Sequence, residues 1–298
     1  MSAHVLSGLV LSGLVLAGVL AGCGSATSTA PAGTPAPSRP GESATTNRGT
    51  PAPRGDAYHY RPTKSVRYTL NRHDSLDLQL PGGASQVQVV DRTAFLRVSL
   101  AEASGGFQAM IVLDSLRGTS GGQPLPSDSL YLASGTRWTA QLSPAGRLSG
   151  VRADKASSLG DQVASSLPLL FPTLPAGGAR AGMQWSDSAQ APVKADAFDV
   201  TEQLVTHTRA VEGEEPGGTR ALRLESAARY ARSGTGKQAD QTLEMTSSGA
   251  RLGVAYLGRD GTLLAAEGSD SGNMTITVPA VGQTVPVKQS ARYRIRKQ

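Results

Sequence analysis

The sequence predicts a mainly β protein, a curved antiparallel sheet or half-barrel built from β-meanders with one helix inserted near the middle. Three observations support this fold class. Apolar residues alternate with polar ones in many segments, glycine-rich turns separate these segments, and a single stretch has apolar residues at helical spacing. Aromatic residues make up only 4% of the chain, so the core has to be filled mainly by Val, Leu, Ile and Ala.

Period-2 alternation is typical of strands that bury one face and expose the other. The segments that show it are Val66 to Leu70, Leu76 to Leu80, Leu96 to Leu100, Phe107 to Leu113, Leu222 to Tyr230, Met274 to Val278 and Tyr293 to Ile295. Turns are predicted at 81–83, 104–106 and 144–146, and the pair Asp260-Gly261 is a strong hairpin signal.

One helix is predicted over 154–171, with Asp154 as its N-cap and Pro168 and Pro172 ending it. The apolar strip from Leu169 to Pro175 should then pack over an open end or face of the sheet. If the sheet holds a ligand, this segment would form the lid. The lid candidates are Leu159, Val163, Leu167, Leu170 and Phe171.

The region 57–298 is long enough for one large domain or two small ones. Segments 138–148 and 254–264 are both predicted to form a strand, a glycine-containing turn and a second strand. They are consistent with two related halves, 57–153 and 177–298, joined by the helix. Chance similarity between hairpins explains the match equally well.

The N-terminus has the features of an export signal. Residues 1–22 contain no Lys, Arg, Asp or Glu, and the apolar run ends in Leu20-Ala21-Gly22-Cys23. This tetrapeptide resembles the lipobox of bacterial lipoproteins. The resemblance implies a signal peptide over 1–22, diacylglycerol on the Cys23 sulfur and a location in the cell envelope, anchored to a membrane and facing away from the cytoplasm. Because Gly24 is not Asp, the outer membrane is slightly favoured in a cell with two membranes.

Two alternatives to a lipid anchor stay open. They are an uncleaved membrane helix and an ordinary cleaved signal followed by a chance cysteine. Cys23 is the only cysteine, so the exported part has neither a disulfide nor a catalytic thiol. Residues 23–56 are rich in Pro, Ser, Thr and Gly and are predicted to form a disordered tether with a reach of about 30 Å.

Three segments of the body resemble parts of uncharacterised bacterial lipoproteins. They are 170–175, Gly182-Met183-Gln184-Trp185, and the hairpin running from Gly253 to Gly268. The overall plan, a lipid anchor followed by a curved sheet with an inserted helix, is also similar to envelope lipoprotein carriers whose half-barrel holds acyl chains. This likeness implies an acyl chain or another apolar molecule as ligand.

Sequence motifs for catalysis are weak. Ser120 lies in a G-x-S-x-G match, but Pro124 and Pro126 follow where that motif requires a helix, so a flexible loop is expected. Gly234-Thr235-Gly236-Lys237 lacks the first glycine and the final Ser or Thr of a phosphate-binding loop and is interpreted as a glycine-rich turn.

Beyond the signal, the histidines are His59, His73 and His207, and their spacing fits no zinc motif. A triad of Ser120 with His73 or His207 and Asp74 is the remaining route to a hydrolase, and nothing in the spacing favours it. No catalytic residue, metal or cofactor is therefore expected.

The formal net charge is +6, and most of the basic residues are Arg. Arg292, Arg294 and Arg296 alternate along the last strand beside Lys288 and Lys297. This stripe either meets anionic lipid headgroups or is a solvated face that protects a sheet edge. Nucleic acid is a poor partner for an exported chain with few aromatic residues.

Two functions follow as hypotheses. The first is a non-enzymatic, membrane-anchored envelope lipoprotein that binds an acyl chain or other apolar ligand under the 159–174 segment. The alternative is a structural or interaction lipoprotein with a filled core that presents a surface to a partner protein or the cell wall.

Overall fold

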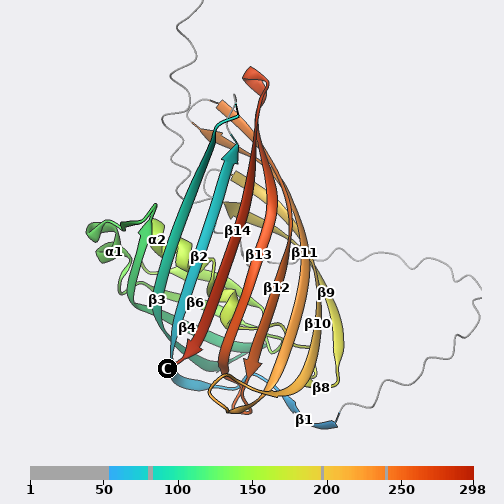
Figure 1. The fold of residues 1–298 in the computed structure, drawn as a ribbon. Helices are drawn as coiled ribbons and strands as arrows, with labels where there is room; N and C mark the ends of the chain where they lie inside the picture. Colours follow the sequence, from blue (N-terminus) through green and yellow to red (C-terminus); the bar gives the residue numbers. More distant parts are fainter. Residues whose placement is uncertain (1–53, 80–82, 196–197, 239–240) are drawn as a thin grey trace, which may run out of the picture.

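The computed structural model describes residues 54–79, 83–195, 198–238 and 241–298 (Figure 1). The signal peptide, Cys23 and the tether up to residue 53 lie outside the described residues. Within the described part, no helix has both the length and the apolar character needed to cross a membrane.

Nearly all strands belong to one antiparallel sheet of 12 strands, in the order β7-β6-β4-β3-β2-β14-β13-β12-β11-β10-β9 with β5 paired to β4. Its strands are β2 Thr63–Gln79, β3 Ser85–Ala103, β4 Gly106–Ser120, β5 Gln123–Pro124, β6 Arg137–Leu142, β7 Leu148–Ala153, β9 Gln184–Ala195, β10 Phe198–Glu214, β11 Arg220–Gln238, β12 Gln241–Leu257, β13 Leu263–Val278 and β14 Gln283–Lys297. A 3₁₀ turn, η2 Pro279–Val281, links the last two strands. β1 Arg54–Tyr58 and β8 Ala179–Ala181 form a separate two-stranded sheet.

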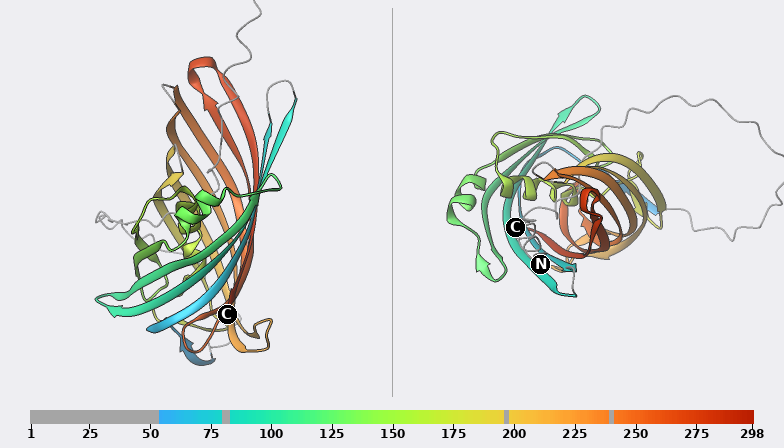
Figure 2. Two further views of the ribbon diagram at one scale, coloured as in Figure 1. Left: turned by 90° about the vertical axis from the view of Figure 1, so that its left-hand side faces the viewer. Right: turned by 90° about the horizontal axis from the view of Figure 1, so that it is seen from above.

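The sheet is open and strongly curved, which confirms the predicted fold class (Figures 1 and 2). It consists of two meanders, β2 to β7 and β9 to β14, joined where β14 pairs with β2 through Val287 opposite Leu78 and Ile295 opposite Leu70. β14 is therefore a central strand. The prediction that its arginine stripe protects a sheet edge is wrong, because the last strand of the chain is enclosed by β2 and β13.

The alternating residues turn toward the concave face and form two apolar clusters. The lower cluster, at the C-terminal end of β14 in Figure 1, includes Leu70, Leu96, Ile111, Leu222 and Ile295. The upper cluster lies toward the opposite ends of the long strands. Its buried members are Leu76, Leu78, Phe198, Val200, Leu243, Met245, Met274, Ile276, Val285 and Val287.

The predicted helix is present but shorter and divided. α2 covers Ser158–Ala164, and a 3₁₀ helix, η1, covers Leu167–Leu170. Ser157, not Asp154, is the N-cap, because its extended backbone lets its hydroxyl accept the Gly160 N–H at 3.2 Å. Asp154 instead accepts the backbone N–H of Arg137 at 3.0 Å. A second short helix, α1 Ser127–Ala133, was not predicted.

The segment from Gly234 to Lys237 is not a turn, as the sequence suggested, but lies inside β11. Gly234 faces β10, and a Cβ atom there would come within 2.6 Å of the Val200 Cα and 2.8 Å of its Cγ1. This glycine therefore serves close packing in the upper cluster and not backbone reversal.

Candidate functional site: a pocket on the concave face

Between the two apolar clusters the concave face carries a belt of charged and polar side chains. The belt contains four arginines, Arg72, Arg92, Arg232 and Arg251, and three carboxylates, Asp74, Glu202 and Asp270. These residues continue the inward register of the apolar positions. On β2, for example, Leu70, Arg72, Asp74 and Leu76 all share one face.

The first half of the belt is centred on Asp74, whose carboxylate is fully buried. Its oxygens accept hydrogen bonds from Arg92 and from Arg72 Nε, the latter at 2.8 and 3.0 Å. The same two arginines reach the inserted segment, where Arg72 donates to Ser166 Oγ at 3.2 Å and Arg92 to Gln162 Oε1 at 2.5 Å. Burial lowers the pKa of Arg92, and Asp74 opposes this shift. The inserted segment is thus attached to the sheet by a buried polar network.

The second half of the belt is centred on Arg251, which joins two carboxylates. Arg251 lies 3.0 Å from Glu202 and 2.9 Å from Asp270, and Arg232 binds Glu202 Oε2 at 2.5 Å. Both guanidinium groups stack on the Tyr230 ring, with their Cζ atoms 4.8 and 4.7 Å from its centroid.

The Tyr230 hydroxyl completes this network by donating to Asp270 Oδ1 at 3.0 Å and accepting from Gln289 Nε2 at 2.6 Å. Burial, with a contribution from Asp270, raises the pKa of Tyr230 to about 12. Tyr230 is therefore protonated at neutral pH and acts here as a hydrogen-bond donor, not as a base.

Inward-facing glycines make room for two tyrosines of the concave face, Tyr230 and Tyr293. A Cβ at Gly272 would lie 2.5 Å from the Tyr230 hydroxyl oxygen, and Gly249 also faces that hydroxyl. A Cβ at Gly253 or Gly268 would lie 3.0 or 2.6 Å from the Tyr293 hydroxyl oxygen. The hydroxyl ends of both tyrosines therefore lie where a side chain at these positions would project, which explains the glycines there.

A pocket of about 210 Å³ opens beside this belt. Its apolar walls include Leu169 of η1, Leu204 of β10 and Ala228 of β11, and its polar walls include Arg72, Arg232, Arg251, Asp270 and Gln289. A site with apolar walls and a polar side is suited to a molecule that has both an apolar and a polar part. The volume fits a small ligand or one segment of a larger ligand, since pockets for drug-sized molecules start at about 300 Å³.

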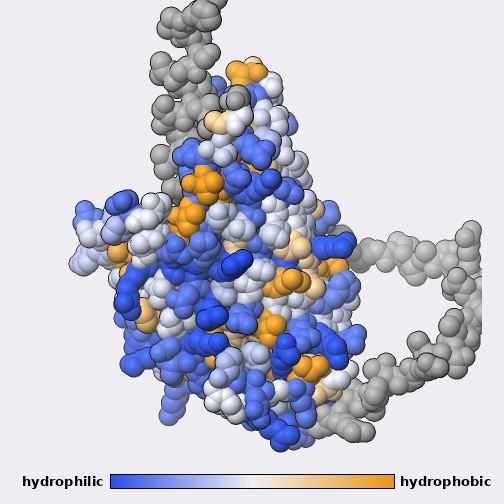
Figure 3. Space-filling view, viewed as in Figure 1, coloured by the Kyte–Doolittle hydropathy of each residue, from blue (hydrophilic) through white to orange (hydrophobic). Residues whose placement is uncertain are grey.

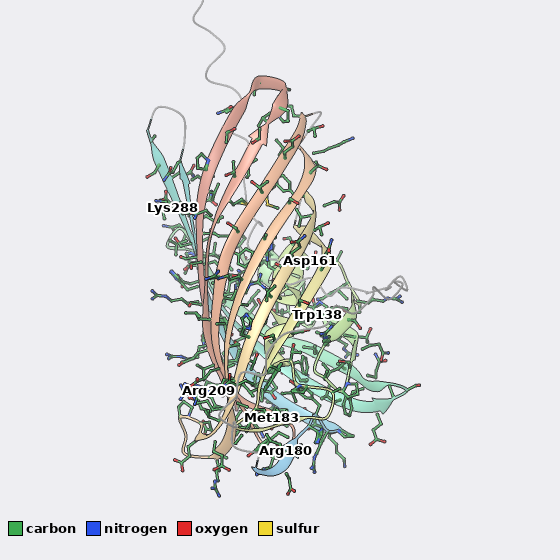
Figure 4. All side chains as sticks on the ribbon, turned by 90° about the vertical axis from the view of Figure 1, so that its right-hand side faces the viewer. Trp138, Asp161, Arg180, Met183, Arg209 and Lys288 are labelled. Atoms are coloured by element: carbon green, nitrogen blue, oxygen red, sulfur yellow. The ribbon has the colours of Figure 1, made fainter. Side chains whose placement is uncertain are left out.

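All five lid candidates are buried in the lower cluster, with exposed fractions from 0% at Leu167 to 7% at Leu159. The space between α2 and the sheet, lined by Val163, Gln162 and Arg92, measures only about 10 Å³. Side chains therefore fill the region directly beneath α2. The inserted segment borders the larger pocket through Leu169 instead, one residue before a predicted lid position. Figure 4 shows Asp161 of α2 on the same side of the long strands as buried Trp138, and Lys288 on the opposite side.

The candidate triad residues are not brought together. Asp74 binds arginines on the concave face, whereas His73 points to the outer face and its Nδ1 lies 2.7 Å from Asp91 Oδ1. His207 pairs with Ser186 Oγ at 2.7 Å on the outer side of β9 and β10. Ser120 ends β4 next to a two-residue turn, so no strand-to-helix elbow forms. Among the described residues, no group of three His, Cys, Asp or Glu side chains is placed to hold a metal ion.

Comparisons with known proteins find only distant structural similarities. No family model and no curated protein matches the sequence. Among solved structures, the chain is similar to DynF from the dynemicin biosynthesis pathway of Micromonospora chersina, with 12% identity, a TM-score of 0.22 and coverage of 86% of this chain and 92% of DynF. It is also similar to a DUF1329 family protein from Desulfovibrio piger, with 12% identity, a TM-score of 0.17 and coverage of 79% and 87%. At these values neither likeness assigns a family or a function.

Proposed function

We propose that this chain is a non-enzymatic lipoprotein of the cell envelope, tethered through Cys23, whose concave pocket holds an acyl chain or another apolar group. The observation that carries the proposal is the pocket of about 210 Å³ between two apolar clusters, with Leu169 and Leu204 on its walls. Because these two side chains are only half-buried, covering them with an apolar ligand removes further apolar surface from water.

The belt gives the pocket a fixed polar side. Its guanidinium and carboxylate groups are held by mutual hydrogen bonds, so the site needs little reorganisation when a ligand arrives. A ligand with an apolar chain and a polar end therefore has one preferred orientation, with its chain against Leu169 and Leu204.

The direct test is native mass spectrometry of the full chain, purified from a bacterial envelope in mild detergent, combined with organic extraction. We expect a stoichiometric adduct that the organic phase releases as an acyl-bearing molecule. The Leu204→Glu variant should lose the adduct, because a carboxylate would then face the apolar wall of the pocket. An apo mass for the wild-type chain with an empty extract would reject ligand binding.

The lipid anchor needs its own test, because Cys23 lies outside the described residues. Growth with radiolabelled palmitate should label the wild-type chain and leave Cys23→Ala unlabelled. Equal labelling of both chains would reject Cys23 as the lipidated residue.

A second candidate function, an interaction lipoprotein, is favoured by the exposed tip of α1. Tyr131 and Leu132 are adjacent and 82% and 58% exposed, which is unusual for large apolar side chains side by side. A photo-crosslinking amino acid at position 131 should capture a discrete partner in cells if this surface docks a protein, and no specific adduct if it does not.

A further inference from the structure

The outer face of the sheet contains a second, larger hollow, separate from the concave pocket. This outer groove has a volume of about 1140 Å³ and crosses the sheet from β4 to β11. Most of its lining residues point outward and form two neighbouring rows, and residues between the rows, such as Arg72 and Tyr293, also border it. Figure 3 shows this face with apolar residues among hydrophilic ones.

The two rows are set by strand register. In the first row Arg294 of β14 pairs with Glu267 of β13, which pairs with Val254 of β12. In the second, Arg292 pairs with Ser269, which pairs with Leu252. Each row thus runs from an arginine, across one strand, to an aliphatic side chain about 10 Å away.

The two rows differ at the residue on β13. Because of this difference, the Arg292 guanidinium has no carboxylate beside it among the described residues. Arg294 lies 3.6 Å from the Glu267 carboxylate. Arg292 has Ser269 in the corresponding place, and among the described residues it has no carboxylate partner. Its neighbour on the other side, His73, is bonded to Asp91 at 2.7 Å, and Glu225 of the same groove is bonded to Arg223 at 3.0 Å.

The apolar end of the second row is also exposed to solvent. Leu252 is 60% exposed although it lies on β12, an interior strand of the sheet. An exposed leucine two strands from an unpaired guanidinium, both inside one hollow, matches a molecule with an anionic head and an apolar chain.

We propose that the outer groove is a binding site for an anionic single-chain amphiphile, such as a fatty acid. Its head binds Arg292, and its chain crosses Ser269 to lie on Leu252 and Val254. The two hollows lie on opposite faces of the sheet, so residues of the strands between them, such as Leu252 and Ser269, border both. Arg292 and Val254 border only the outer groove, and Leu169 and Leu204 border only the concave pocket.

The test uses the full chain in membrane vesicles from expressing cells, a fatty acid that carries a photoactivatable diazirine, and peptide mapping after illumination. The control probe is the methyl ester of the same acid, which has the same chain but no charge. We expect the acid to label the peptide that contains Leu252 and Val254 several-fold more than the ester does.

Two arginine variants supply matched controls. Arg292→Gln should lower this labelling by up to about fivefold, the upper end expected for a solvent-accessible ion pair. Arg229→Gln should leave it unchanged, because Arg229 is also exposed on the outer face but does not line the groove. In the same way, Leu252→Ser should reduce labelling, and Val205→Ser, exposed outside the groove, should not.

Equal labelling by the acid and the ester, or labelling that Arg292→Gln does not alter, overturns the proposal. Labelling confined to the peptides with Leu169 and Leu204 also overturns it, while supporting ligand binding in the concave pocket. Because Arg292 borders only the outer groove, the effect of Arg292→Gln distinguishes the two sites in one experiment.

Discussion

The lower and upper apolar clusters share one sheet face but are sealed in different ways. The lower cluster combines strand residues with Leu167, Leu170 and Phe171 from the inserted segment. The buried members of the upper cluster all come from strands. The inserted segment thus seals the lower part of the concave face, and the pocket opens where that segment reaches Leu169, beside the charged belt. A curved sheet therefore becomes a solid core or a binding surface depending on how far a second element covers it.

The largest expected effect concerns the belt between the clusters. Asp74→Ala removes the carboxylate that compensates Arg72 and Arg92, and should lower the free energy of unfolding by about 3–5 kcal/mol, because a buried charge is left unpaired. Asp91→Ala, which breaks an exposed pair with His73, should cost at most about 1 kcal/mol. Urea denaturation monitored by circular dichroism measures both. Equal costs would mean that the buried pairs of Asp74 contribute no more to stability than an exposed ion pair.

The seal of the lower cluster is tested by Leu167→Ala. Leu167 is fully buried, so the truncation should cost about 2–5 kcal/mol. Leu169→Ala should cost clearly less, since Leu169 is half-buried beside the pocket. Thermal unfolding of the two variants compares them directly. If Leu169→Ala were the more destabilising variant, the boundary between core and pocket would be wrongly placed.

Substitution of the glycines that face the tyrosine side chains should destabilise the fold. Gly268→Ala brings a Cβ to 2.5 Å from the Leu252 carbonyl oxygen and 2.6 Å from the Tyr293 hydroxyl oxygen, and should cost about 1–3 kcal/mol. Gly177→Ala is the control, because open space surrounds that glycine. In a Tyr293→Phe background the Gly268→Ala penalty should shrink, and a double-mutant cycle measures the coupling. No coupling would show that the tyrosine does not determine the need for glycine.

The smallest effect is expected at the turn that closes the lower end of β12 and β13. Partial burial raises the pKa of Asp260, but hydrogen bonds from Thr262 and the Lys297 ammonium outweigh it, so the pKa is lowered. A lowered pKa contributes stability above the unfolded value of about 4, and this stability is lost as the pH falls through the folded value. Asp260→Asn should therefore flatten the acid limb of stability against pH. An unchanged acid limb would contradict this assignment.

Much of the sheet could be predicted because apolar and polar residues alternate in the parts of the strands that form the two clusters. The belt was missed because polar residues occupy inward positions there, although Arg72 and Asp74 continue the register from Leu70 to Leu76. That continuity is the signal that could have found them. The central position of β14 depends on pairing between residues more than 200 positions apart, which local pattern does not encode. The N-cap was misplaced because two residues with capping side chains, Asp154 and Ser157, precede the helix.

The central claim, that the concave pocket holds a ligand, is tested most directly by filling it. Ala228 lines the pocket, whereas Ala227, the preceding residue on β11, is exposed on the outer face. Native mass spectrometry of the full chain should show the acyl adduct in wild type and Ala227→Phe and little or none in Ala228→Phe, with all three equally folded by circular dichroism. Full occupancy in Ala228→Phe would contradict the claim.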